Sequence, residues 1–326
     1  MVEAIRFGGL HHGAGGGTGI GVKQTGARRW VKVLLVAVPA WLLVSGAVGV
    51  WWQIRRSARS EAEEHAKYPR SVNAAELADD VRKIAFVVGE RGTGSVEAGR
   101  GLDRVASLID GSLGPSNTGY EVTRVAGPRT GERGWPLIEV VRSGREKELP
   151  GVWVVCGYDA QAGQRGVEWN ATGVAAAMAA ARELVDDDLR RSLHFLFLPH
   201  VFDQDAPLLE TAAQAVRRIT AAGGAWQVLC VDSMGRSGQL AVGSRVADAP
   251  VVTEIAGLGR MAGAEALCLQ DDFDLASVLF ESGLPAARVT SSAQLTGSGP
   301  ESLPDPQVVA GSSGRLVELL RRLAGG

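Results

Sequence analysis

The chain has 326 residues, 45% of them hydrophobic, which is enough for one medium-sized core with appended segments. Residues 1–60 hold eight of the 34 basic and one of the 36 acidic side chains, so the rest of the chain is net acidic. That acidic body argues against nucleic-acid binding. Three cysteines, Cys156, Cys230 and Cys268, are too few and too scattered for a disulfide framework.

The first segment is rich in glycine and has no apolar period, which predicts a disordered tail over residues 1–29. Val33–Trp52 then runs for 20 residues without a charge. About 20 residues are needed to cross a bilayer as a helix, so we predict a transmembrane anchor over residues 30–54 that contacts lipid through residues 33–52.

A cleaved signal peptide is the alternative for this segment. Its apolar part is usually about 7–15 residues long and ends in small residues, whereas here it ends in Trp51 and Trp52. Basic residues flank both ends almost equally, so they barely indicate the orientation. A polar, charged stalk is predicted over residues 55–71.

Beyond the stalk, apolar strand-like runs alternate with amphipathic stretches, a pattern that predicts a three-layer α/β sandwich with a mixed, mostly parallel sheet over residues 72–326. Asn73 is suited to cap the first helix. In chain order, we predict a helix from Asn73 to Val88, a helix over 96–109, strands over 120–125, 137–141 and 152–156, a helix over 170–185, a strand over 193–198, a helix over 207–222, a strand over 226–231, a helix near 250–262, a strand over 266–269, a helix over 274–282, a strand over 285–290 and a helix over 306–323.

The segment 152–173 carries the most information. The run VWVVC (152–156) is typical of a buried strand, and the chain turns after it through Gly157-Tyr-Asp159. A helix is expected to start at Asn170-Ala-Thr-Gly173. This resembles the central unit of the zinc aminopeptidases of metallopeptidase family 28, in which the strand ends in a His-Tyr-Asp-like triplet. Three more stretches are similar to family motifs in the same order: LHFLFLPHVF (193–202), VLCVDSMG (228–235) and FESGLPAARV (280–289).

The resemblance implies a zinc aminopeptidase fold whose metal ligands are missing. The position of the first metal-binding His falls on Gly157, that of the bridging Asp on Trp169, and the glutamate pair on Val201 and Phe202. Asp232 matches an Asp ligand, and Asp159 matches the carboxylate that orients the first His. No histidine follows His200. A zinc pair needs about five such ligands, so we expect no zinc and no other cofactor.

The remaining polar residues admit two interpretations each. Asp232 is a residual ligand for a single metal or, as we favour, a cap for the turn after its strand. Cys156, His200 and Asp159 (or Asp232) could form a thiol–histidine–acid set, but a buried, inert cysteine is the simpler interpretation.

Two further hypotheses concern the pocket. Asp159 is expected to bind backbone amides of its own loop. Trp169 is expected to fill the space that the metals have left.

These observations predict a membrane-anchored, catalytically inactive aminopeptidase-like domain on the extracytoplasmic side that binds a peptide or a protein. The alternative is a hydrolase with an unconventional site, using Cys156 and His200 or a single metal at Asp232.

Overall fold

The computed structural model describes residues 72–255, 265–266, 274–291 and 301–325, all within one unit, Arg70–Gly326. The predicted tail, anchor and stalk (residues 1–29, 30–54 and 55–71) lie outside the described residues. Within the described part of the chain, no helix has the length and hydropathy needed to cross a membrane.

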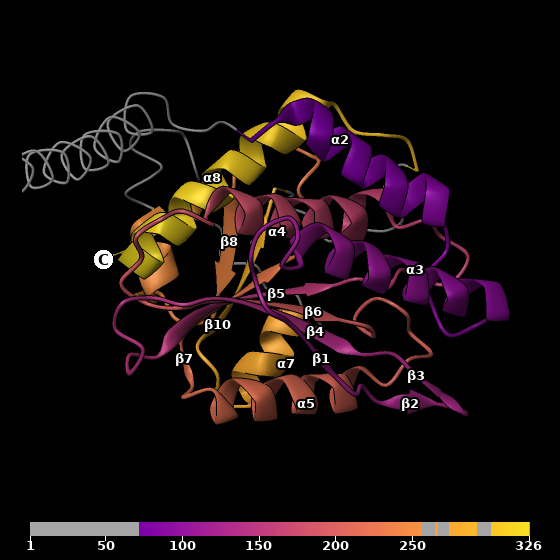
Figure 1. The fold of residues 1–326 in the computed structure, drawn as a ribbon, viewed down its shortest axis with the longest axis horizontal. Helices are drawn as coiled ribbons and strands as arrows, with labels where there is room; N and C mark the ends of the chain where they lie inside the picture. The colour runs from indigo at the N-terminus through magenta and orange to yellow at the C-terminus, as the bar shows by residue number, and fades with distance from the viewer. Residues whose placement is uncertain (1–71, 256–264, 267–273, 292–300, 326) are drawn as a thin grey trace, which may run out of the picture. The chain divides into compact units, whose positions relative to one another are not determined.

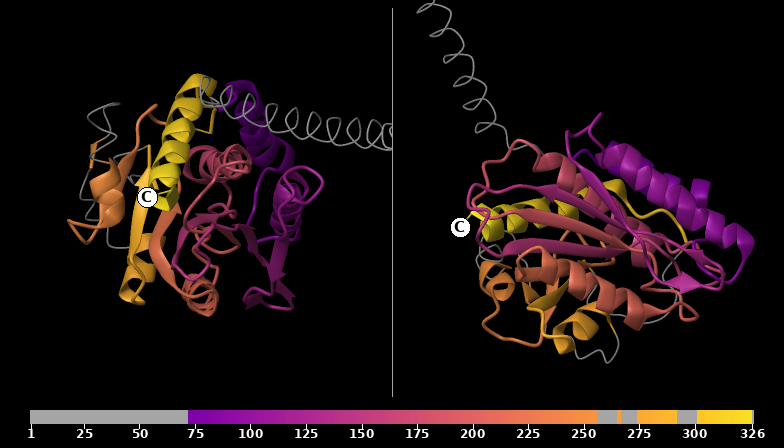
Figure 2. Two further views of the ribbon diagram at one scale, coloured as in Figure 1. Left: turned by 60° about the vertical axis from the view of Figure 1, so that its left-hand side comes forward. Right: turned by 60° about the horizontal axis from the view of Figure 1, so that its bottom comes forward.

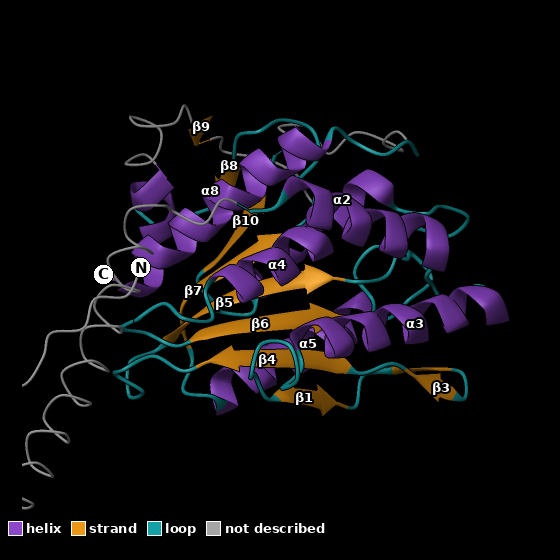
Figure 3. Cartoon of the chain, turned by 45° about the horizontal axis from the view of Figure 1, so that its top comes forward, coloured by secondary structure: helices purple, strands orange, loops and turns teal. Residues whose placement is uncertain are grey.

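A mixed sheet forms the centre of the fold (Figures 1 and 3). Its four middle strands, β6, β5, β7 and β10, run parallel. Strands β1 and β4 pair antiparallel with their neighbours, and β8 is antiparallel to β10 but parallel to β9. The predicted mixed, mostly parallel sheet is therefore confirmed. In sheet order the strands are β1 (Val122–Val125), β4 (Leu137–Arg142), β6 (Leu193–Leu198), β5 (Gly151–Gly157), β7 (Ala225–Val231), β10 (Ala286–Thr290), β8 (Ala241–Ser244) and β9 (Glu265–Ala266).

Helices cover both faces of the sheet, giving three layers. Figures 1 and 2 show α2, α3, α4 and α8 on one face and α5 and α7 on the other. Each face has its own apolar cluster: Ala175 and Leu320 belong to the first, and Ala215 and Leu279 to the second. The helices described over their full length are α2 (Ala74–Arg82), the π-helical turn η1 (Lys83–Val88), α3 (Val96–Leu113), the π-helical turn η2 (Val167–Ala171), α4 (Thr172–Glu183), α5 (Leu208–Ala221), α7 (Leu275–Glu281) and α8 (Pro306–Gly325). Residues 250–255 are helical as well, and the remainder of the helix predicted near 250–262 lies outside the described residues.

Local sequence explains why these elements begin and lie where they do. The Asn73 side chain accepts hydrogen bonds from the amides of Ala75 and Glu76, as expected of a helix N-cap. Every residue of β5 is buried, as expected for a central parallel strand covered on both faces. Gly173 lets α4 approach the end of β7, because a Cβ atom there would lie 1.9 Å from the Asp232 carbonyl oxygen.

Some elements differ from those predicted. Strand β8 and the small hairpin of β2 (Arg129–Thr130) and β3 (Arg133–Gly134) have no counterpart in the sequence prediction. Helix α4 begins at Thr172 rather than at Asn170, because η2 precedes it.

Candidate functional site

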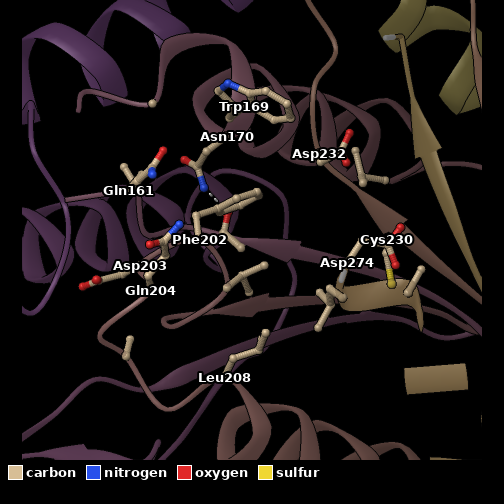
Figure 4. Close-up of a pocket in the computed structure, with 18 of the residues that line it drawn as sticks. Gln161, Trp169, Asn170, Phe202, Asp203, Gln204, Leu208, Cys230, Asp232 and Asp274 are labelled. Carbon is tan, nitrogen blue, oxygen red and sulfur yellow. Dashed lines mark hydrogen bonds between the residues drawn. The ribbon is translucent and has the colours of Figure 1, made fainter. Parts of the chain in front are cut away.

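A cavity of about 1070 Å³ opens where β5, β6 and β7 end (Figure 4). The carboxyl ends of parallel strands are the usual place for ligand sites in α/β folds. Gly157, Trp169, Val201, Phe202 and Asp232 all line this cavity. The structure therefore brings together the five positions that the resemblance assigned to metal ligands, although they span 75 residues of sequence.

At the end of β5, Gly157 has no space for a side chain. A Cβ atom at this position would lie 2.6 Å from the Val201 Cβ atom and 2.8 Å from Phe202 Cε2. Both distances are far below the roughly 3.5–4.0 Å of ordinary carbon–carbon contact. Val201 and Phe202 therefore occupy the volume that a ligand side chain at residue 157 would need.

Asp159 fixes this part of the wall. Its Oδ2 atom accepts hydrogen bonds from the backbone amides of Val201 (2.8 Å), Phe202 (2.8 Å) and Asp203 (2.9 Å). The expectation that Asp159 binds its own loop missed these three partners, which belong to the loop after β6, although its own backbone amide also helps to lower its pKa. Burial raises the pKa of Asp159 to about 7, and the three amides oppose that rise.

Asp232 has a cation beside it that the sequence interpretation missed. It follows β7, and its Oδ2 atom forms an ion pair with Nε of Arg288 on the neighbouring strand β10. Its Oδ1 atom accepts a hydrogen bond from the Ser233 amide, in line with the favoured role as a cap. Burial raises the pKa of Asp232, and Arg288 counteracts the rise. The guanidinium thus supplies the positive charge that a metal ion would bring to this carboxylate.

Trp169 lines the cavity without filling it. Its indole is partly exposed, and the large cavity remains beside it. Trp169 therefore does not close the cavity, and near Gly157 the space is taken by Val201 and Phe202. The hypothesis that the indole fills the remaining space left by the metals stays a prediction. Figure 4 shows Trp169 on the opposite side of Phe202 from Leu208.

Asn170 connects the elements around the cavity instead of capping a helix. Its Nδ2 atom donates to the Gly157 carbonyl (2.5 Å), and its Oδ1 atom accepts from Arg91 (2.9 Å). Arg91 is buried and also donates to the carbonyls of Tyr158, Ile84 and Gly89. Burial lowers the pKa of Arg91 to about 10. These bonds hold η2 against the end of β5.

The candidate nucleophile and base do not reach the cavity. Cys156 and His200 are both fully buried, and neither lines it. The Cys156 thiol faces its neighbour's carbonyl, and burial raises its pKa well above the ordinary value. The His200 ring packs edge-on against Trp135 with 5.7 Å between centroids, and burial lowers its pKa. A thiol–imidazole pair exposed to substrate is not formed here.

Three further carboxylates that sequence reasoning did not single out line the cavity: Glu210, Asp203 and Asp274. Asp203 accepts hydrogen bonds from the amide (2.6 Å) and the hydroxyl (2.8 Å) of Thr93. Asp274 caps α7 by accepting from the Ser277 amide (2.6 Å). An aspartate directly before the apolar run of α7 is a recognisable capping signal, but nothing local indicates that Asp203 or Arg288 faces a cavity.

The residues present do not fit a two-zinc centre. Across residues 72–255, 265–266, 274–291 and 301–325, no three His, Cys, Asp or Glu side chains are grouped so that they could hold a metal ion. Of the five positions, Gly157, Trp169, Val201 and Phe202 offer no ligand atom, and Asp232 is paired with Arg288.

Comparison with solved structures identifies the fold as that of the zinc aminopeptidases of the family 28 type, which confirms the resemblance seen in the sequence. The LapA aminopeptidase of Legionella pneumophila matches with a TM-score of 0.62 and 14% identity over 78% of this chain and 72% of that one. BSAP, a zinc aminopeptidase from Bacillus subtilis, matches with a TM-score of 0.63 and 10% identity over 79% and 97%.

The Porphyromonas gingivalis glutaminyl cyclase shares the same fold, with a TM-score of 0.56 and 16% identity over 78% of this chain and 100% of that one. No protein-family model matches the sequence, and no curated protein matches it either. Because the identities are so low and the similar structures include both peptidases and a cyclase, the likeness establishes the fold and leaves the activity to be argued from the site.

Proposed function

We propose that this domain binds a peptide segment of a partner protein in the cavity without metal-dependent hydrolysis. The observation that carries the proposal is that the cavity is open while its ligand positions are replaced. Val201 and Phe202 fill the space beside Gly157, and Arg288 neutralises Asp232. A site altered in this way retains volume for a peptide but lacks the side-chain ligands for a metal ion that would activate water.

The chemistry of the wall supports peptide binding. Binding sites are typically concave and largely apolar with a few polar groups. Here Trp169, Phe202 and Leu208 supply apolar surface, and the amide side chains of Gln161 and Gln204 supply hydrogen-bonding groups. A partly exposed tryptophan at such a site is typical of residues that contribute strongly to binding.

The test of binding uses the purified full-length chain and two mixtures of fluorescent peptides, one blocked at both ends and one with free amino termini. Trp169→Ala should weaken binding at least about tenfold, as expected for a central aromatic contact. Trp226→Ala is the matched control: Trp226 is also partly exposed, but it stacks beneath Arg191 outside the cavity. Equal weakening by both changes, or no peptide binding at all, would overturn the proposal.

The absence of metal chemistry is tested separately. Elemental analysis of the purified chain should find no stoichiometric zinc, and a chelator should leave its melting temperature unchanged. A leucine p-nitroanilide assay should detect no turnover. Two zinc ions per chain, or hydrolysis that the chelator abolishes, would show that an aminopeptidase site is present after all.

We further propose that residues 33–52 anchor the domain to a membrane and that the domain faces the extracytoplasmic side. The support is the uncharged 20-residue stretch and the short basic segment before it. Protease added to intact spheroplasts should remove residues beyond about Arg70. Protection until lysis would reverse the orientation, and release of the chain from membranes by carbonate washing would argue against an anchor.

A further inference from the structure

The charge of the cavity indicates what kind of segment it accepts, an inference that rests on the proposed peptide binding. Among the described residues that line it, four are acidic (Asp203, Glu210, Asp232 and Asp274) and one, Arg288, is basic. Asp232 and Arg288 form an ion pair and balance each other. The remaining lining residues therefore leave the cavity with an excess of negative charge.

The carboxylates of Asp203 and Asp274 are held in place by hydrogen bonds from backbone amides. Asp203, only 3% exposed, accepts from the amide of Thr93, and its Oδ1 atom also accepts from the Asp205 amide (3.2 Å). Asp274 is fixed by its bond to the Ser277 amide. Oxygens held at defined positions lose little freedom when a donor binds, so they favour a ligand whose charge reaches them.

An aromatic side chain separates these two carboxylates. Figure 4 shows Asp203 beside Gln161 and Gln204 on one side of Phe202, and Asp274 beside Cys230 on the other. A lysine or arginine side chain has a long apolar stem and a charged end. It can therefore lie along Phe202 and place its cation near a carboxylate, or over the aromatic face itself.

We propose that the cavity selects peptide segments that carry a basic side chain next to an apolar one. Asp274 and Asp203 attract the positively charged end of that basic side chain. An acidic segment would meet uncompensated negative charge on both sides of Phe202. Recognition by a side chain does not require a free amino terminus, so a peptide blocked at both ends carries the complete ligand chemistry.

The experiment compares two blocked tetrapeptides on the full-length chain, both containing phenylalanine. One has arginine next to it and the other has citrulline, which matches arginine in shape but carries no charge. The arginine peptide should bind about three- to tenfold more tightly in low salt, the range for one partly screened ion pair. The ratio of the two dissociation constants should approach one in high salt.

Two substitutions assign the selectivity to residues. Asp274→Asn removes the charge but keeps an oxygen that can cap α7, since asparagine is an equally good N-cap. Asp305→Asn is the matched control, because Asp305 is exposed, accepts from the Gln307 amide near the start of α8 and lies outside the cavity. The arginine-to-citrulline ratio should fall in Asp274→Asn and stay unchanged in Asp305→Asn, and Asp203→Asn should lower it as well.

The outcomes separate the two proposals. If both peptides bind equally well, or if neither Asp274→Asn nor Asp203→Asn lowers the ratio, the charge selectivity is refuted while peptide binding stands. If only peptides with a free amino terminus bind, recognition by a basic side chain is likewise refuted. If no peptide of any kind binds, the proposed function itself fails.

Discussion

Adding a single methyl group at residue 157 tests whether Val201 and Phe202 have closed the former ligand position. In Gly157→Ala, the new Cβ atom would lie 2.6 Å from Val201 Cβ, 2.8 Å from Phe202 Cε2 and 2.9 Å from Val201 Cγ2. Ordinary carbon contacts are roughly 1 Å longer. Three amides of this loop are bonded to Asp159, so the loop cannot move away easily.

Overpacking of this kind typically costs about 1–3 kcal/mol, so we expect Gly157→Ala to lower the free energy of unfolding by that amount. The measurement is urea unfolding of the full-length chain, followed by near-ultraviolet circular dichroism. Gly111→Ala is the control: Gly111 is exposed within α3, and a Cβ atom there would meet nothing within 4 Å. It should stabilise the helix by about 0.5–1 kcal/mol. A Gly157→Ala protein as stable as the native one would show that Val201 and Phe202 move aside readily. They would then not have closed the ligand position at residue 157.

Three further predictions concern charge and capping. Arg288→Met should destabilise the protein by about 3–5 kcal/mol, because it leaves the Asp232 carboxylate without its countercharge, and adding Asp232→Asn should recover part of that loss in the same urea assay. Burial raises the pKa of Asp159 to about 7, so the native state keeps a proton that the unfolded chain already releases near pH 4. The free energy of unfolding should therefore fall as the pH rises from about 4 to about 7, by at most roughly 4 kcal/mol. Asp159→Asn should flatten this dependence, and an unchanged profile would exclude Asp159 as its source. Asn73→Ala should cost about 1 kcal/mol through loss of the α2 cap, whereas Asn73→Asp should be nearly neutral if capping is the cause.

Much of the fold was predictable because its strands are short, continuous apolar runs that alternate with helices. Runs such as Val152–Cys156 and Leu193–Leu198 are buried on both faces, so their composition alone indicates central strands. Strand β8 was missed because Ala241–Ser244 is short, contains Gly243 and lacks a β-branched run. Its pairing with β10 joins residues far apart in the chain, so no local sequence pattern predicts it.

The site was predictable in position but not in its interactions. Gly157 and Asp232 could be placed at the site because each follows a predicted parallel strand, and the carboxyl ends of parallel strands meet at one edge of the sheet. The ion pair with Arg288 depends on β7 and β10 being neighbours, with Cys230 opposite Arg288, and this order cannot be read from the sequence. The partners of Asp159 lie 42 to 44 residues away, so only the folded chain identifies them.

The walls of the cavity come from residues as far apart in the chain as Gly157 and Arg288, so no short fragment of the domain contains the whole site. The cavity exists only when β5, β6, β7 and β10 have assembled, and a ligand that enters it binds the native state alone. Such a ligand raises the free energy of unfolding by about 2.7 kcal/mol at a concentration one hundred times its dissociation constant. Occupancy of this site would therefore reduce the fraction of the domain that is unfolded, and the cellular lifetime of the protein would follow the supply of any ligand of this cavity.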